Sequence, residues 1–220
     1  MSRVLPILFN TEMVRAILED RKTVTRRICK DANEFTVPDM NFYDADKRTY
    51  AVHNYADAEH TEKLSIAERK CPICPDDILY VRETWFKDIE RYMYRANYSE
   101  NEKFFKNGEE IVLKWKPSIH MPKEAARIFL KVKNVRVERL QDITEEQAKA
   151  EGICEEWAMA WWKPTYYDPD SGGYPKYRDT FAFDLWNSTI KKSELDKYGW
   201  KANPWVWVIE FERCEKPENF

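Results

Sequence analysis

A short basic stretch near the N-terminus, EDRKTVTRR at residues 19–27, gathers side chains that could perform chemistry. It holds four cations, two hydroxyls and two acids, although the whole chain carries a net charge of −3. Strand alternation would turn Thr25 and Arg27 to one face, with Lys22 at the turn before them. A lysine can serve as a base, a hydroxyl as a nucleophile and an arginine as an anion-binding group. The same run also fits a solvated surface whose acids neutralise its cations, and the residues alone leave both interpretations open.

Cys71 and Cys74 form a C-x-x-C pair, and the chain's three histidines could complete a zinc site with it. A structural zinc site needs a second ligand pair at matching spacing, and the sequence has none. We therefore predict no metal and no cofactor, and thiols that pack as small apolar residues. Trp115 and His120 flank a predicted loop, from which they would line a pocket.

Composition and charge narrow the classes of function. A net charge of −3 argues against a protein that coats nucleic acid, because such binding rests on many phosphate contacts from Lys and Arg. Any nucleic-acid role must therefore be local. Five glycines, without a GxGxxG or GK[ST] sequence, argue against nucleoside-triphosphate chemistry. Nine tryptophans could stack on bases, but core filling is the expectation for most of them.

The sequence predicts a cytoplasmic protein. No apolar run approaches the ~18 residues that span a bilayer, so no membrane partner is expected. The apolar stretch before Asn10 is too short for a signal peptide. Five cysteines, an odd number in a chain of 220 residues, do not indicate a disulfide framework, so reduced thiols are expected.

Period-two alternation predicts most of the strands. The predicted strands are 4–9, 23–28, 78–83, 126–140 and 205–211. Residues 92–96 would pair with the strand at 78–83. Residues 31–70 are polar, with few apolar repeats, and are interpreted as an extended loop or an irregular insertion. Several strands with few helices indicate a compact barrel.

Capping residues predict three short helices. The first is capped by Asn10 or Thr11 and ends near residue 20. The second covers residues 145–151, because Thr144 forms a capping box and a glycine follows the last turn. The third begins at Asp179 or Thr180. Its apolar face would carry Phe181, Leu185 and Trp186.

The segment from Asp20 to Arg27 resembles the signature of ASCH domains, a branch of the PUA-like β-barrels. In that signature a lysine follows a glycine by two positions, a glutamate or threonine stands three positions later, and an arginine two after that. Lys22, Thr25 and Arg27 hold three of these places, and Asp20 stands where the family usually has glycine.

The rest of the chain supports this resemblance. Residues 75–79 look like the family's Pro-Gly-Asp turn into a strand, with Asp76 in the glycine place. Aspartate tolerates the left-handed conformation that such a turn needs. The sequences VRETW at 81–85 and KPSIHMP at 116–122 look like those of bacteriophage and prophage proteins.

The resemblance implies an α+β fold, a PUA-like (ASCH) β-barrel with short flanking helices and large loop insertions. It implies one elaborated domain over residues 1–220. The core segments would lie at about 3–30, 75–85, 126–152 and 203–212, and together they would cover somewhat less than half of the chain. The insertions would be 31–70, 86–125 and 153–200.

The resemblance also implies a chemistry. Small bacterial ASCH proteins include amidohydrolases that remove the acetyl group of N4-acetylcytidine with a lysine, a threonine and a glutamate. Lys22 and Thr25 match the first two, and Glu151, at the end of the predicted helix, matches the third. Thr25, or a water beside it, would attack the acyl carbon while Lys22 takes the proton. Neighbouring arginines and burial would have to lower the pKa of Lys22 by roughly three units from about 10.4.

A second interpretation is a binding module that recognises RNA or a modified nucleoside without chemistry. Lys22, Arg26 and Arg27 would hold phosphate, and an aromatic ring would stack on a base. Such a module has no need of a hydroxyl at 25 or an acid at 151. A third interpretation is a phage accessory protein that binds a host protein. The candidate binding residues are Arg21, Arg26, Arg27, Trp115 and His120.

Overall fold

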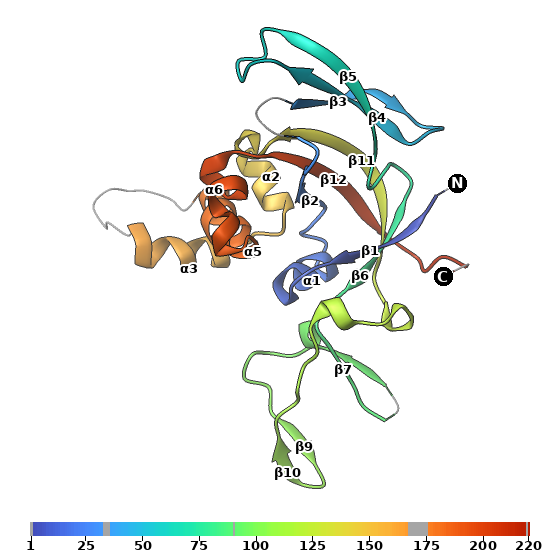
Figure 1. Ribbon diagram of the computed structural model, residues 1–220. Coiled ribbons are helices and arrows are strands. Elements are labelled where there is room, and N and C mark those ends of the chain that lie inside the picture. Colours follow the sequence, from blue (N-terminus) through green and yellow to red (C-terminus); the bar gives the residue numbers. More distant parts are fainter. Residues whose placement is uncertain (1, 33–35, 90, 167–175, 219) are drawn as a thin grey trace.

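A five-stranded sheet forms the centre of the molecule (Figure 1). The computed structural model describes residues 1–220 except 1, 33–35, 90, 167–175 and 219, and it describes no side chains for 163–166. The strand order is β1 (Val4–Leu8), β6 (Ile78–Arg82), β11 (Phe129–Arg139), β12 (Trp205–Cys214) and β2 (Val24–Ile28). β1 runs parallel to β6, and the other neighbours are antiparallel. The five predicted strands of this sheet are confirmed.

The two edge strands of this sheet, β1 and β2, approach each other because the sheet curves. Arg27 Nη2 on β2 donates to the carbonyl oxygen of Leu8 at the end of β1, at 3.0 Å. Phe9, just after β1, packs on Phe211 of β12. Among the described residues, no backbone ladder joins β1 to β2. The mixed α and β fold is therefore confirmed, whereas a closed barrel is not found.

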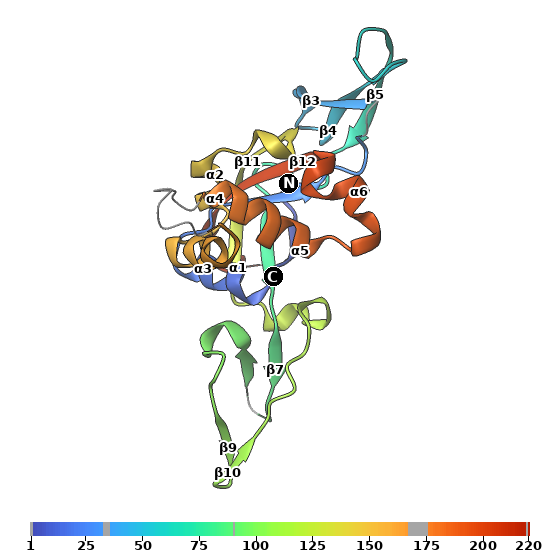
Figure 2. The same ribbon diagram turned by 90° about the vertical axis from the view of Figure 1, so that its left-hand side faces the viewer.

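Short helices lie together beside the sheet (Figures 1 and 2). The α-helices are α1 (Thr11–Leu18), α2 (Glu145–Ala150), α3 (Glu155–Tyr166), α4 (Tyr177–Asp179), α5 (Asn187–Thr189) and α6 (Leu195–Tyr198). A π-helix, Thr180–Trp186, joins α4 to α5. The 3₁₀ turns are Arg95–Asn97, Ser118–His120, Lys123–Ala125, Leu140–Asp142, Lys192–Glu194 and Trp200–Ala202. Within the described part of the chain, no helix is long and apolar enough to cross a bilayer.

Two of the predicted helix starts are confirmed, and the third is wrong. Asn10 accepts a hydrogen bond from the backbone of Met13, and Thr144 forms its capping box. The third helix begins at Tyr177 rather than after Asp179 or Thr180. Its first backbone N–H groups donate to Glu145 of α2, at 2.8 and 3.4 Å. The cap comes from a residue distant in sequence, so local capping rules place the start too late.

Residues 36–70 form a sheet, which corrects the extended loop or irregular insertion predicted for 31–70. Its strands are β3 (Thr36–Asp44), β4 (Thr49–Tyr55) and β5 (Lys63–Lys70), in antiparallel order β3-β4-β5. The central strand buries Tyr50 and Val52 against the main core, whereas β5 is exposed along most of its length. The sheet buries few side chains, so its sequence shows little of the alternation that marks a strand.

A projecting arm forms at the opposite end of the molecule from β3-β4-β5 (Figure 1). Its strands pair as two hairpins, β7 (Trp85–Lys87) with β8 (Tyr92–Tyr94) and β9 (Phe104–Lys106) with β10 (Glu109–Ile111). The expected pairing of residues 92–96 with the strand at 78–83 is therefore wrong. Both sides of β6 already pair, with β1 and β11, and a short hairpin partner is closer in sequence.

Two aspartates adopt the left-handed backbone conformation at the places where the ASCH signature has glycine. Asp20 has φ +56° and Asp76 has φ +67°. The conformation expected at Asp76 is confirmed. Asp20 ends the turn after α1, and this turn delivers the chain directly to Lys22.

Candidate functional site

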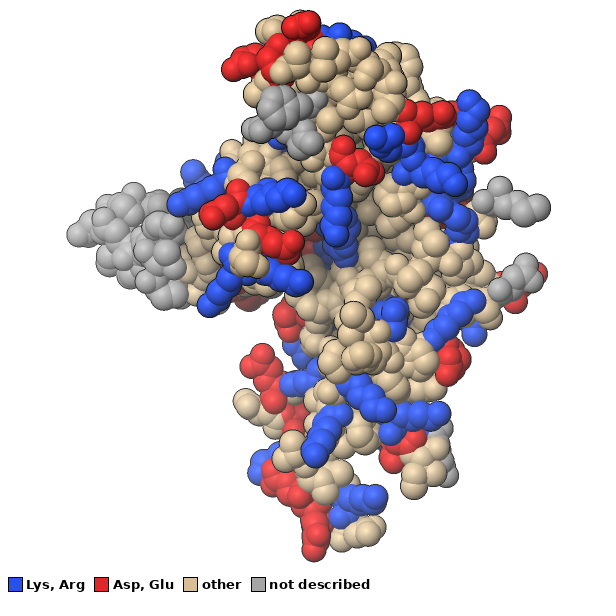
Figure 3. Space-filling view, in the orientation of Figure 1, with Lys and Arg blue, Asp and Glu red and all other residues tan. Residues whose placement is uncertain are grey.

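A pocket of about 340 Å³ lies between the two edge strands of the curved sheet. Its lining comes from the end of β1 and α1, from residues 22–28, from Glu151 after α2, and from residues 181–190. Figure 3 shows Lys and Arg side chains gathered around the hollowed middle of one face. Five of the eight predicted site residues line this pocket. They are Lys22, Thr25, Arg26, Arg27 and Glu151.

The backbone fixes Lys22 beside Glu151 before any side chain contributes. These two residues form an isolated antiparallel bridge, and Thr23 N–H donates to the carbonyl of Ala150 at 2.9 Å. Gly152 follows with φ +102°, and a Cβ there would lie 2.7 Å from Cβ of Ala16 on α1. Only glycine suits both the conformation and the close approach. The predicted glycine after α2 is therefore also what lets α1 and Lys22 pack against the helix end.

Lys22 and Glu151 form a buried ion pair. Lys22 Nζ lies 2.6 Å from Glu151 Oε2, and it also donates to the carbonyl oxygen of Glu151 at 2.8 Å. Their side chains are only 1% and 3% exposed. Burial lowers the pKa of Lys22 from 10.5 to about 8; Glu151 opposes this shift, and the charges of Arg27 and Arg26 add to it. Lys22 can therefore lose its proton near neutral pH, as the sequence interpretation requires.

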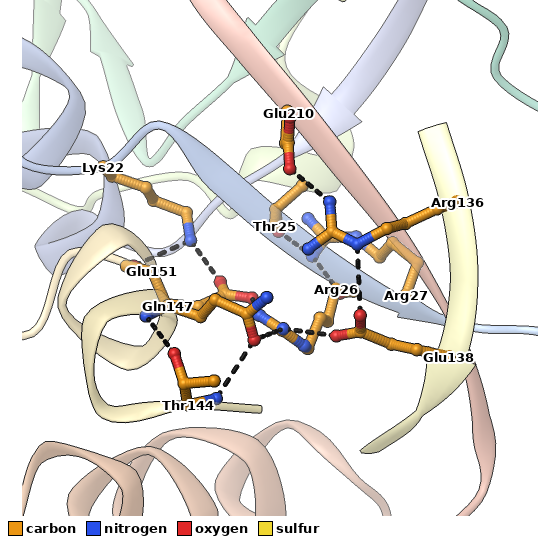
Figure 4. Close-up of polar contacts among 10 residues, drawn as sticks. All are labelled: Lys22, Thr25, Arg26, Arg27, Arg136, Glu138, Thr144, Gln147, Glu151 and Glu210. Carbon is orange, nitrogen blue, oxygen red and sulfur yellow. Dashed lines mark hydrogen bonds and ion pairs between the residues drawn. The ribbon is translucent and has the colours of Figure 1, made fainter. Parts of the chain in front are cut away.

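Arg26 holds the second oxygen of Glu151 and ties the pair to a longer row of charges (Figure 4). Its Nη1 donates to Glu151 Oε1 at 3.1 Å, and its Nη2 donates to Glu138 at 2.5 Å and to Gln147 at 2.9 Å. Glu138 in turn pairs with Arg136, which also pairs with Glu210. Signs alternate along this row, from buried Lys22 to partly exposed Glu210. Each buried charge therefore has an opposite neighbour, which buried ions require.

Thr25 and Arg27 form a second contact in the pocket. Arg27 Nη1 donates to Thr25 Oγ1 at 2.6 Å and to the carbonyl of Arg26 at 2.9 Å. Because the Thr25 hydroxyl accepts from Arg27, its own hydrogen is left to donate. The Arg27 guanidinium lies over the ring of Phe9, 5.2 Å from its centroid, and burial lowers its pKa. Strand alternation thus does place Thr25 and Arg27 together, as predicted.

An apolar wall faces these charged groups, and the sequence interpretation missed it. Phe181, Leu185 and Trp186 come from the π-helix, within the segment 153–200 that was interpreted as an insertion. They share one face, as the third predicted helix required, but nothing in their spacing points to a pocket. The Trp186 indole N–H donates to the carbonyl of Tyr198 at 2.8 Å, which fixes the ring. π-Helices often occur at functional sites.

Three predicted binding residues do not line this pocket. Arg21 pairs with Glu19 and donates to the carbonyl of Gly152. Trp115 lies in the arm, in an aromatic cluster with Phe86, Tyr98 and Phe104. His120 ends an exposed 3₁₀ turn. After Trp115 the chain returns to the central sheet, where Arg82 of β6 donates to the carbonyl of Met121, but neither Trp115 nor His120 lines the pocket between β1 and β2.

The C-x-x-C pair lies in another buried polar cluster. Cys71 and Cys74 are buried, and burial raises the pKa of the Cys71 thiol. Asp77, whose side chain is inaccessible, accepts hydrogen bonds from Arg3, Arg48 and the backbone of Cys74. Among the described residues, no three His, Cys, Asp or Glu side chains are grouped to hold a metal ion.

Comparisons of the chain with protein-family models, with curated proteins and with solved structures found no significant match. The resemblance to ASCH domains therefore stays a prediction from the motif residues and their order. Any function must be argued from the pocket itself.

Proposed function

We propose that this protein is an ASCH-type, PUA-like protein that binds a modified nucleoside in the pocket between β1 and β2 and hydrolyses an amide on it, as in N4-acetylcytidine. The observation that carries this proposal is the convergence of Lys22, Thr25 and Glu151 on one pocket, although Glu151 is 126 positions or more from the others in sequence. The pocket lies between β1 and β2, which no backbone ladder joins among the described residues.

The proposed reaction balances with residues of this chain and one water. Neutral Lys22 takes a proton from the Thr25 hydroxyl, or from a water beside it, as that oxygen forms a bond to the acyl carbon. The carbonyl oxygen becomes an oxyanion, which Arg27 stabilises. Lys22 then returns the proton to the leaving nitrogen as the carbon–nitrogen bond breaks. If Thr25 attacks, water hydrolyses the acyl ester in a second, similar cycle.

The charges around the pocket favour the protonation changes that this reaction requires. With a pKa of about 8, Lys22 is neutral in roughly one tenth of molecules at pH 7. Arg27 brings to the pocket a cation whose guanidinium donates to the Thr25 hydroxyl and to carbonyls of Arg26 and Leu8, and this charge favours an oxyanion over the neutral amide. The wall of Phe181, Leu185 and Trp186 offers an apolar surface to a flat ring.

Incubation of the protein with N4-acetylcytidine, followed by measurement of acetate release, tests the proposal. We expect the rate to rise with pH through an apparent pKa near 8 and to fall by about a hundredfold or more in Lys22→Met. Thr25→Val separates attack by the hydroxyl, which it abolishes, from attack by water. Trp115→Ala serves as the control outside the pocket. Absence of acetate release across the pH range would refute the hydrolytic proposal.

A non-catalytic RNA-binding module is the second candidate, and Arg27 favours it. Its partly exposed guanidinium lines the same pocket as the apolar wall, on which a base could stack. Arg26 is unsuited to the phosphate contact expected of it, because its side chain is fully buried and already holds Glu151 and Glu138. Salt-sensitive RNA binding lost on Arg27→Ala, without acetate release, would favour this candidate.

A further inference from the structure

We propose that Arg26 is a positioning residue for this chemistry, which keeps the Glu151 carboxylate charged and in place while Lys22 gives up its proton. This inference rests on the proposed function, in which Lys22 acts as a base. Arg26 lies outside the ASCH-like signature, whose arginine position is held by Arg27. It therefore adds a residue that the motif does not predict.

The two oxygens of the Glu151 carboxylate contact two different cations, Lys22 and Arg26. Glu151 Oε2 lies 2.6 Å from Lys22 Nζ, and Oε1 lies 3.1 Å from Arg26 Nη1. Arg26 is itself fixed on its other side by Glu138, at 2.5 Å, and by Gln147, at 2.9 Å. Gln147 also accepts from the backbone N–H of Thr144, so the capping box of α2 and the charged row share one amide (Figure 4).

This sharing of the carboxylate matters when Lys22 becomes neutral. In an isolated Lys–Glu pair, loss of the lysine proton would leave a buried carboxylate without a counter-charge, which is strongly unfavourable. The Arg26 guanidinium lies against the other oxygen of Glu151, so that carboxylate keeps a cationic partner there. Its side chain is completely inaccessible to solvent, so water does not screen this contact.

The charged groups that face Lys22 come from two elements. Glu151 follows α2, and Arg26 and Arg27 come from β2, with Glu138 of β11 behind Arg26. β1, α1 and residues 181–190 contribute only uncharged side chains to the pocket lining. Without Arg26, the Glu151 carboxylate would interact with Lys22 alone. The substitution would also remove one cation that repels the Lys22 ammonium. Both changes favour the charged ammonium.

NMR titration of protein labelled with ¹³C at the lysine ε carbon tests this role without any substrate. The Lys22 signal is assigned by its loss in Lys22→Met. We expect a midpoint near 8 in the native chain, and a rise of about one pH unit or more in Arg26→Met. Arg26→Lys, which keeps the charge, should restore most of the native midpoint.

A second variant gives a shift in the opposite direction. Glu138→Gln removes an anion from the neighbourhood of Lys22. It also strengthens the interaction of Arg26 with Glu151, because Glu138 no longer competes for the guanidinium, so the Lys22 midpoint should fall. If the row of charges had only a structural role, both substitutions would shift the Lys22 midpoint in the same direction. Lys133→Met is the control, because Lys133 lies outside this row of charges and pairs with Glu212 on the surface at 3.0 Å, so the Lys22 midpoint should stay at the native value in this variant.

The outcomes separate this inference from the proposed function. A native midpoint in Arg26→Met, or a rise in Glu138→Gln, would overturn the role of Arg26 even if N4-acetylcytidine is hydrolysed. Suppose instead that the Lys22 midpoint rises in Arg26→Met and falls in Glu138→Gln, but the protein releases no acetate. That result would support the role of Arg26 in setting the charge of Lys22 and would refute only the hydrolytic function. If Arg26→Met does not fold, Glu138→Gln and Arg26→Lys decide the question.

Discussion

The buried Lys22 ammonium should make the stability of this protein depend on pH in a defined direction. Its pKa falls from 10.5 to about 8 on folding, chiefly because of burial. Below about pH 8 the lysine is charged in both states, so its full cost to folding is present. Between pH 8 and 10.5 the folded protein has lost the proton that the unfolded chain still binds, so this cost shrinks as pH rises. The difference between the two pKa values corresponds to about 3 kcal/mol.

Lys22→Met isolates this contribution, because methionine fills the same space and does not titrate. Other groups also titrate in this range, such as Cys29, whose pKa burial raises to about 11, and Tyr50, whose pKa burial raises further. They contribute equally to both proteins. The free energy of unfolding in urea, native minus variant, should therefore rise by about 3 kcal/mol between pH 7.5 and 10.5.

The matched control is Lys133→Met. Lys133 is 53% exposed, and its ammonium lies 3.0 Å from Glu212 on the surface, so its removal should produce no pH-dependent difference. A flat difference between the native protein and Lys22→Met over the same range would refute the reasoning. It would show that the ion pair with Glu151 outweighs burial and holds Lys22 charged.

Three further predictions concern stability. Gly152→Ala should destabilise the fold by roughly 2–4 kcal/mol, because φ is +102° and the new Cβ would overlap α1. The control is Gly108→Ala, at φ +84° with no atom near the new Cβ, which should cost only about 1 kcal/mol. Thermal denaturation of the two variants measures the difference. Burial raises the pKa of Asp77, but the hydrogen bonds from Arg3 and from the backbone of Cys74, together with the charge of Arg3, outweigh burial and hold that pKa below the ordinary 3.8. Asp77→Asn should therefore destabilise the fold at neutral pH, and acid unfolding of both proteins should show the difference shrink as pH falls through the folded pKa. Trp115→Ala should speed hydrogen exchange in residues 85–116 and leave the pocket's ligand affinity unchanged; a loss of affinity would place the arm in the site.

Local sequence rules predicted the features that depend on near neighbours. Sequence patterns located the five strands of the main sheet, among which β6 has buried residues at period two and β12 has a continuous buried run at 206–209. Asn10 and Thr144 were found as caps, because a capping side chain bonds a backbone group only three residues away. The motif spacing brought together Lys22 and Thr25 as candidates, and residue type alone indicated that Asp76 tolerates a left-handed turn.

The same rules failed where the decisive partner lies far along the chain. The start of α4 depends on Glu145, and the sheet at 36–70 depends on Tyr50 and Val52 packing against the main core. No local pattern records either contact. Trp115 and His120 were predicted to line a pocket because they flank a loop, but Trp115 packs in the arm's aromatic cluster and His120 ends an exposed turn, and neither lines this pocket.

The sequence by itself thus determined which residue types could perform the chemistry, and roughly which strands and helices carry them. Only the tertiary structure decided their charge states and partners. Burial of Lys22, the sharing of Glu151 with Arg26, and the apolar wall at 181–190 each arise from segments more than a hundred residues apart. A pKa depends on desolvation and on charges within a few ångströms, and both are properties of the packed molecule.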